Sequence, residues 1–231
     1  MLSLQLARFN LALARLAGRG SVGASDAIWT ICDHIKCRDF LAKCDSGMSG
    51  IMKYDVIIGN PPWGYRFGSL TQKYLRREYR TAAGRHAESY DVFVERALEL
   101  LSDDGTIEFI LPEALLDVKN HMTARSIIAE TANVSRVRFV GDAFHGVQCP
   151  AVVLQLVKSS DPGHCIGARV DKGGDTFAIY TDRPLDGEKF ILRLSDEEYG
   201  LLVKLERSDN CTYLHGQADF ALGIVTGDNN K

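Results

Sequence analysis

Four consecutive residues, Asn60-Pro61-Pro62-Trp63, combine groups that could hold a planar amino group. The two prolines fix the backbone and remove two N–H donors, so the carbonyl groups beside them keep defined directions. Asn60 adds a side-chain oxygen acceptor, and Trp63 adds a flat face on which a base can stack. Two acceptors that face one amino group would orient its lone pair toward a methyl donor. The alternative is a rigid loop whose tryptophan fills the core.

The segment before this turn is expected to be a strand. Residues 54–58 are apolar apart from Asp55, as expected for a parallel strand that is covered on both faces. In an open parallel sheet, ligands bind beyond the carboxyl ends of the strands. The turn therefore lies where a ligand site is expected, which favours the binding interpretation.

Helices and strands alternate over the first 158 residues. Helices are expected over 2–16, 24–34, 90–101 and 122–132, and strands over 106–111, 134–140 and 151–157. This alternation predicts an α/β domain with a mostly parallel sheet of at least four strands. The short connection 141–150 makes one of the last two strands antiparallel.

The chain changes texture beyond Lys158. Residues 159–163 (SSDPG) are typical of a linker. Further strands are expected over 176–180 and 189–194. Ser195 is expected to begin a helix that runs to about residue 206, with Glu198 completing a capping box.

Composition excludes several classes of protein. The chain has 231 residues, of which 45% are hydrophobic and 25% charged, enough for one sizeable globular domain. No apolar run approaches the ~20 residues that span a bilayer, and arginines inside residues 1–16 argue against a signal peptide, so a cytoplasmic protein is expected. The six cysteines form no Cys-x-x-Cys pair, which argues against a zinc site. The net charge of −3 does not favour a free-standing nucleic-acid binder, although it allows a local basic groove.

The sequence resembles the adenine-specific DNA methyltransferases of restriction–modification systems, in the subgroup with an Asn-Pro-Pro-Tyr/Phe/Trp motif and a C-terminal target-recognition domain. The resemblance is most specific over residues 55–63, 90–101, 105–112, 139–144 and 150–154. It implies an incomplete Rossmann-like sheet of the S-adenosylmethionine-dependent methyltransferases. It also implies a catalytic domain over 1–158, followed over 159–231 by a linker and the beginning of the recognition domain.

The resemblance assigns the turn and one aromatic residue to the target base. Asn60 and the carbonyl of Pro61, in the turn completed by Pro62, would hold the amino group of an adenine flipped out of double-stranded DNA. Trp63 and Phe144 would stack on opposite faces of that adenine. Because flipping costs a few kcal/mol and each stacked face returns ~1–3 kcal/mol, two aromatic faces make the flipped state tenable. Phe144 lies in an expected loop, where a core role is harder to justify.

The resemblance assigns three residues to S-adenosyl-L-methionine. Asp39 and Phe40 would contact its adenine, and Phe93 would form an apolar wall of the same pocket. From the residues alone, Phe40 and Phe93 are equally compatible with core positions, and Asp39 with a turn. No metal is expected, because the methyl sulfonium is itself the activated electrophile.

Two family features have no counterpart in these residues: the glycine-rich loop Asp-Pro-x-Cys-Gly-Ser-Gly and the acidic residue that binds the cofactor ribose. Residues 220–231 resemble the opening of the recognition domain. We therefore expect a fragment that is inactive alone and whose partners are DNA, an N-terminal cofactor-binding segment and the remaining recognition domain.

Other functions remain open from the sequence. One alternative is a methyltransferase that acts on a protein glutamine or a ribosomal RNA guanine through the same turn. Another is a non-catalytic nucleic-acid-binding or assembly module. A basic run over residues 73–85 could contact phosphates, but it is more typical of a solvated helix face.

Overall fold

The computed structural model describes residues 37–43, 53–84, 87–142 and 149–207. The chain divides into two compact units, residues 1–49 and 50–231. In the first unit, the described residues form a turn in which the Oδ1 of Asp39 accepts a hydrogen bond from the backbone N–H of Leu41 at 3.0 Å. The predicted helices over 2–16 and 24–34 lie outside the described residues. No described helix is both long and apolar enough to cross a membrane.

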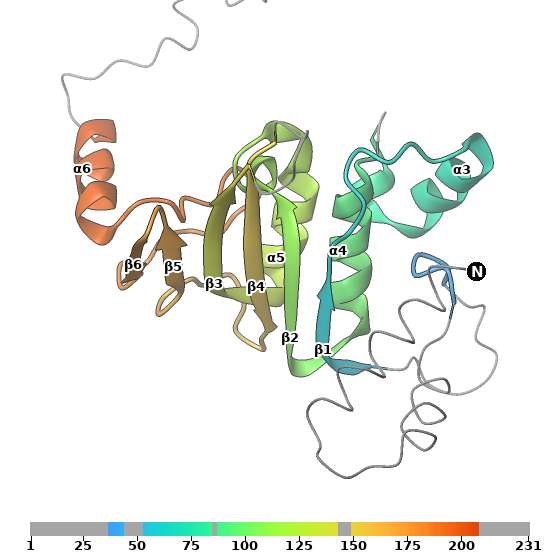
Figure 1. Ribbon diagram of the computed structural model, residues 1–231, viewed down its shortest axis with the longest axis horizontal. Coiled ribbons are helices and arrows are strands. Elements are labelled where there is room, and N and C mark those ends of the chain that lie inside the picture. The colour runs from blue at the N-terminus through green and yellow to red at the C-terminus, as the bar shows by residue number, and fades with distance from the viewer. Residues whose placement is uncertain (1–36, 44–52, 85–86, 143–148, 208–231) are drawn as a thin grey trace, which may run out of the picture. The chain divides into compact units, whose positions relative to one another are not determined.

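The second unit contains a six-stranded mixed sheet (Figure 1). In spatial order its strands are β1 (Tyr54–Gly59), β2 (Leu101–Pro112), β4 (Ala151–Lys158), β3 (Ala132–Gly141), β5 (Arg169–Lys172) and β6 (Asp175–Ala178). The pairs β1–β2 and β3–β5 are parallel, and the other pairs are antiparallel. The predicted α/β class, the four strands before residue 158 and the antiparallel pairing of β3 with β4 are confirmed. The expectation of a mostly parallel sheet is wrong for the described strands, because β4 and β6 run antiparallel to their neighbours.

Helices α4 (Ser89–Leu100) and α5 (Met122–Thr131) lie against one face of this sheet (Figure 1). Strand β2 alternates between the two faces, so that every second side chain is buried against the helices. The core on this face includes Val92, Leu98, Ile107, Phe109, Leu111, Ile128, Val137, Leu154 and Leu156. The predicted helices over 90–101 and 122–132 are confirmed, because their apolar residues recur at helical spacing.

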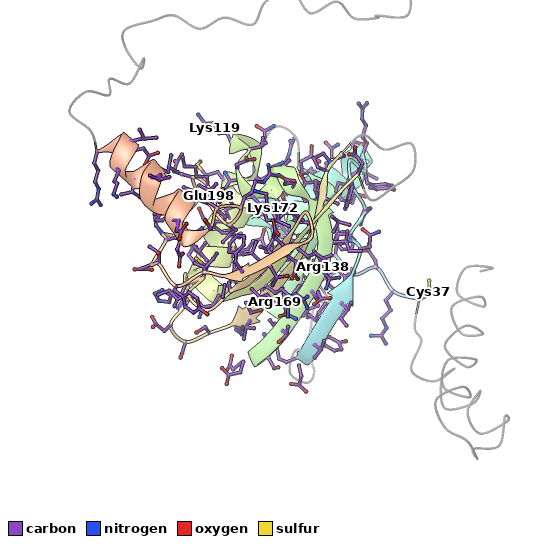
Figure 2. The ribbon with its side chains drawn as sticks, turned by 60° about the vertical axis from the view of Figure 1, so that its left-hand side comes forward. Cys37, Lys119, Arg138, Arg169, Lys172 and Glu198 are labelled. Carbon is purple, nitrogen blue, oxygen red and sulfur yellow. The ribbon has the colours of Figure 1, made fainter. Side chains whose placement is uncertain are left out.

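The opposite face carries polar and charged side chains. The amide of Gln155 on β4 donates to the carboxylate of Glu108 on β2 at 3.0 Å. Arg138 on β3 and Arg169 on β5, labelled in Figure 2, are both exposed. Both pair with Asp171, and nearby guanidinium groups hold the pKa of this carboxyl well below its usual range.

Strand β1 shows where burial differs from the prediction. Its outward residues Val56 and Ile58 are 59% and 75% exposed, so the expected cover on both faces is wrong for the part of the chain that the structure describes. The physical reason is position. Within that part, β1 is the edge strand, and α4 and α5 cover only the other face.

The remaining described helices are short. They are α3 (Ser69–Glu78), α6 (Asp196–Glu206) and the 3-10 turns η1 (Arg80–Ala82), η2 (Glu113–Leu116) and η3 (Lys119–His121). Helix α6 begins with the predicted capping box: the backbone N–H of Glu198 donates to Ser195 Oγ at 3.2 Å, and the N–H of Ser195 donates to Glu198 Oε2 at 2.8 Å. Part of the basic run over residues 73–85 lies on α3, as expected if the run is a helix face.

Two predictions after residue 158 need correction. Residues 189–194 form no strand. The buried guanidinium of Arg183 donates hydrogen bonds to the carbonyl groups of Ile191 and Leu194, at 2.9 and 2.7 Å. Their backbone is thus satisfied by a side chain instead of a neighbouring strand. The short strand β5 was not predicted. The strand expected over 176–180 is present as β6, so the sheet continues past residue 158.

Candidate active site

The carboxyl ends of β1, β2 and β3 meet at one edge of the sheet. Gly59 lies opposite Phe109, and Pro112 and Gly141 both lie opposite Ala151. The turn after β1 and the connection from β3 to β4 therefore leave from the same edge. The prediction that the Asn-Pro-Pro-Trp turn follows the carboxyl end of a strand is confirmed.

The turn presents its polar acceptor and fixes its aromatic residue. Asn60 is exposed, Pro61 is buried, and Trp63 is half-buried. The indole N–H of Trp63 donates a long hydrogen bond of 3.4 Å to the carbonyl of Ile110 on β2, which ties the ring to the neighbouring strand. Gly64 has a φ of +60°, a conformation that side chains other than glycine rarely adopt, so the bend after the tryptophan depends on glycine.

Ser89, the first residue of α4, holds this bend from within the protein. Its hydroxyl donates to the carbonyl of Pro62 and accepts the backbone N–H of Tyr65 at 3.1 Å. The side chain is completely buried. Sequence reasoning missed this residue. A serine at a helix start is usually read as a cap, but here the N-cap residue is Glu88, and the hydroxyl of Ser89 bonds to the turn instead.

A buried histidine, His121, contacts the two residues that follow Ser89 in the first turn of α4. Tyr90 and Asp91 both contact His121 at the end of η3: Tyr90 Oη lies 2.8 Å from Nε2, and Asp91 Oδ2 lies 2.9 Å from Nδ1. A proton on Nδ1 satisfies both contacts, because Nε2 then accepts from the phenol. Burial raises the pKa of Asp91, although its hydrogen bond to His121 opposes that rise. Burial also raises the pKa of Tyr90, so the phenol remains protonated.

The predicted cofactor residues fall into different parts of the chain. Phe93 is half-buried and lies four residues after Ser89, on the same side of α4 as the residue that holds the turn. Its predicted contact with the adenine of S-adenosylmethionine stays a prediction. Asp39 and Phe40 belong to the first unit, where the Asp39 carboxylate closes the turn to Leu41. Phe144 lies outside the described residues.

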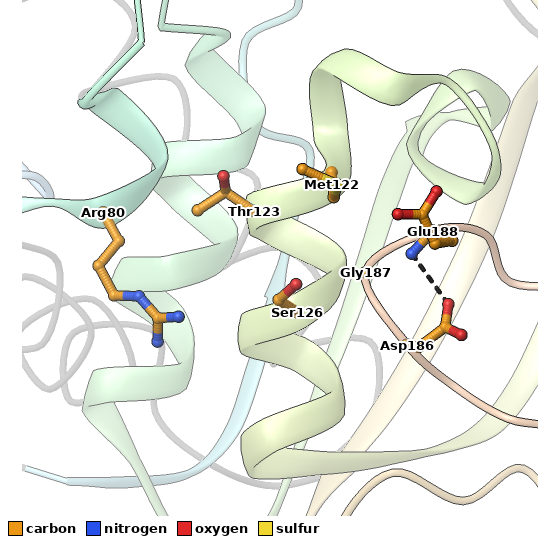
Figure 3. Close-up of a pocket in the computed structure, with 7 residues that line it drawn as sticks. All are labelled: Arg80, Met122, Thr123, Ser126, Asp186, Gly187 and Glu188. Carbon is orange, nitrogen blue, oxygen red and sulfur yellow. Dashed lines mark hydrogen bonds between the residues drawn. The ribbon is translucent and has the colours of Figure 1, made fainter.

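A cavity of about 340 Å³ opens beside α5 (Figure 3). Its lining residues are Arg80, Met122, Thr123, Ser126, Asp186, Gly187 and Glu188. The guanidinium of Arg80 forms an ion pair with Glu130 at 2.6 Å. None of the predicted site residues that the structure describes lines this cavity, so the candidate site is located by sheet topology and turn chemistry.

Comparison with known proteins identifies restriction–modification enzymes as relatives. The Type II methyltransferase M.VspI of Vibrio sp. is 28% identical over 201 residues, which cover 86% of this chain and 47% of the relative. The Type II restriction enzyme and methyltransferase RM.Eco57I of Escherichia coli is 30% identical over 146 residues, covering 61% of this chain and 13% of the relative. The chain thus spans less than half the length of these relatives.

Solved structures give similar matches at low identity. The type I restriction-modification methyltransferase subunit of Streptococcus thermophilus matches with a TM-score of 0.43 and 14% identity, over 83% of this chain and 41% of that one. A putative class I S-adenosylmethionine-dependent methyltransferase of Listeria monocytogenes gives a TM-score of 0.43 and 15% identity, over 72% of this chain and 45% of that one.

The strongest assignment comes from a family profile. The Eco57I restriction-modification methylase profile matches residues 4–144, more than half of the chain, and this range contains the Asn60–Trp63 turn, Ser89 and both helices behind the sheet. The chain therefore belongs to the Eco57I restriction-modification methylase family.

Proposed function

We propose that this chain carries the target-base site of a site-specific DNA methyltransferase that methylates adenine at N6. The observation that carries the proposal is the Asn60–Trp63 turn, which is fixed at the carboxyl edge of the sheet with its acceptor exposed. Relatives that bear the name Type II methyltransferase support the DNA substrate. Such an enzyme would act in the cytoplasm.

The residues of the turn would position the amino group. The Asn60 side-chain oxygen and the Pro61 carbonyl would each accept one N–H, which directs the nitrogen lone pair outward. Trp63 would hold the base by stacking, worth ~1–3 kcal/mol. When bound, S-adenosylmethionine supplies a methyl group activated by a positively charged sulfur. Holding both reactants in place can account for ~7–11 kcal/mol of the barrier, so positioning is the main task of the protein.

The sheet geometry allows Phe144 to complete the base pocket. Three strand spacings separate β1 from β3, or about 14 Å at ~4.8 Å each. Phe144 follows Gly141 by three residues, and three extended residues span about 10 Å. This greatest possible reach, with the phenyl ring added, is comparable to the separation of the two strands, which supports the proposal that Phe144 faces Trp63 across a flipped adenine.

We further propose that these 231 residues alone transfer no methyl group. Asp39, Phe40 and Phe93 would bind the adenine end of the donor, but the sequence contains no glycine-rich loop to hold its methionine end. An added N-terminal cofactor-binding segment would restore the donor site. In this proposal, residues 1–158 are catalytic and residues 159–231 lead into the target-recognition domain.

Tritiated S-adenosylmethionine tests the proposal. The chain is incubated with mixed-sequence DNA, ribosomal RNA or bulk protein, alone and after addition of the N-terminal half of M.VspI. We expect label in DNA, and only in the complemented protein. Label transferred by the isolated chain would overturn the need for a second segment, and label in RNA or protein would overturn the substrate class.

A further inference from the structure

We propose that Ser89 is a positioning residue that sets the orientation of the Trp63 side chain and hence the orientation of the target base stacked on it. The inference rests on the proposed function, because it assigns Trp63 to base stacking. It adds a residue that lies 27 positions from the turn carbonyl it holds and outside the Asn-Pro-Pro-Trp motif.

The serine hydroxyl closes the backbone on both sides of the tryptophan. It donates to the carbonyl of Pro62, which precedes Trp63, and accepts from the N–H of Tyr65, two residues after it. One oxygen thus uses its donor and an acceptor site on a single bend. The enclosed residues are Trp63 and Gly64, and glycine has wide conformational freedom. Without the hydroxyl, the bend loses the two hydrogen bonds that close its backbone on either side of Trp63.

Helix α4 gives the serine a fixed base. The adjacent residues Tyr90 and Asp91 are both anchored on His121, and all three side chains are buried. Ser89 itself is fully enclosed, so it cannot turn outward to solvent. The indole N–H of Trp63 also donates a 3.4 Å hydrogen bond to the carbonyl of Ile110, which is long for an N–H···O contact. The hydroxyl is therefore the firmer of these two restraints.

The chain offers a matched control at the other end of β1. The hydroxyl of Ser102 also bonds to that strand, through the carbonyl of Tyr54 at 3.1 Å and the carboxylate of Asp55 at 2.8 Å. Ser102→Ala therefore removes a serine hydroxyl of β2 that bonds to β1, without touching the turn. Ser89→Thr retains the hydroxyl at the original position and serves as the conservative variant.

The first readout needs no methyl transfer. In a Trp29→Phe background Trp63 is the remaining tryptophan, so its emission and its quenching by acrylamide report on the turn alone. We expect Ser89→Ala to increase quenching and to accelerate hydrogen exchange of the Tyr65 amide by about fivefold to tenfold, as for loss of one hydrogen bond. Ser102→Ala should change neither quantity. Equal quenching and exchange in the Ser89→Ala and parent proteins would overturn the proposal.

The second readout separates positioning from stability. In the protein complemented with the N-terminal half of M.VspI, we expect Ser89→Ala to lower kcat by about tenfold, with an unchanged KM for S-adenosylmethionine and recovery in Ser89→Thr. A fall in kcat that Ser102→Ala reproduces would overturn the proposal. If no form of the complemented protein transfers methyl groups, the proposed function fails, whereas Trp63 quenching still decides whether Ser89 holds the turn.

Discussion

The two ends of the β1–β2 pair are built for different purposes. At the carboxyl end, the strand runs into an exposed asparagine and a fixed tryptophan, and the side chain of Ser89 holds the turn from the interior. At the amino end, the hydroxyl of Ser102 and the ammonium of Lys158 bond to carbonyls of β1 and β2, at 3.1 and 3.2 Å. The contacts at the amino end join neighbouring strands. The carbonyl groups that take part in them already accept hydrogen bonds from the protein.

This difference predicts that substitutions at the two ends should have different effects. Changes at the carboxyl end should affect methyl transfer and base binding more than folding, because the residues there face outward or hold those that do. Changes at the amino end should affect only strand pairing, and weakly, because the groups there are partly exposed and water can replace their partners. The following experiments compare the two ends in order of decreasing effect.

The largest effect is expected from Asn60→Ala. Loss of its side-chain oxygen removes one of the two acceptors proposed to orient the amino group, so kcat of the complemented protein should fall by about 10²–10³. Ser102→Ala should change kcat by less than about twofold. Initial rates of label incorporation into DNA measure both variants, and comparable activity in the two would contradict a functional difference between the ends.

His121→Ala should destabilise the protein by about 3 kcal/mol. The change leaves the buried carboxyl of Asp91 and the phenol of Tyr90 without their shared partner. His164, whose side chain is 45% exposed and pairs with Asp161 at 3.5 Å, is the control, and His164→Ala should cost less than about 0.5 kcal/mol. Urea unfolding monitored by circular dichroism measures both. Equal losses would show that the network behind the turn contributes no special stability.

Trp63→Ala should weaken binding to DNA that contains an unpaired target adenine by ~1–3 kcal/mol, because one stacking face is lost. The control is Tyr180→Ala, which removes a 76% exposed aromatic ring away from the turn. Fluorescence anisotropy of labelled duplexes gives both affinities for the complemented protein. A loss of the same size for Tyr180 would mean that the aromatic contacts are not specific to the turn.

The smallest effect is expected at Asp171, which lies on neither end of the β1–β2 pair. Hydrogen bonds from Arg136, Thr176 and Arg169 hold the pKa of this carboxyl low in the folded protein. A depressed folded-state pKa stabilises the fold above the ordinary aspartate pKa of about 4 and ceases to do so as the pH falls below it. Asp171→Asn should therefore reduce stability at pH 7, and the difference from the parent should shrink in acid. Thermal unfolding from pH 7 to pH 3 tests this, and a difference independent of pH would contradict it.

The sequence predicted the parts of the fold that are decided locally. Helices α4 and α5 follow from apolar spacing, and the capping box of Ser195 and Glu198 follows from two residues three positions apart. The turn after β1 was predicted because two consecutive prolines, which donate no backbone hydrogen bond, rarely continue a strand. The exposure of Val56 and Ile58 was not predicted, because the apolar sequence of a strand does not show which helices or strands pack beside it.

Long-range contacts decided what the sequence could not. The irregular segment 189–194 depends on Arg183, whose guanidinium donates hydrogen bonds to two carbonyl groups of the segment. In the site, Asn60 and Trp63 were found from their chemistry, whereas Ser89 was not, because its role depends on a partner 27 residues away. The contact between Tyr90 and His121 spans 31 residues and has no sequence pattern. The proposed roles of Asp39, Phe40, Phe93 and Phe144 remain predictions.

Identification of the methylated nucleoside tests the central claim most directly. DNA treated with the complemented protein and S-adenosylmethionine is digested to nucleosides and analysed by mass spectrometry, with Asn60→Ala as the matched impaired form. If the Asn60–Trp63 turn holds the amino group of a flipped adenine, the product is N6-methyladenine, and Asn60→Ala forms it about 10²–10³ times more slowly. Methylated cytosine as the product, or N6-methyladenine at the same rate with Asn60→Ala, would contradict the account.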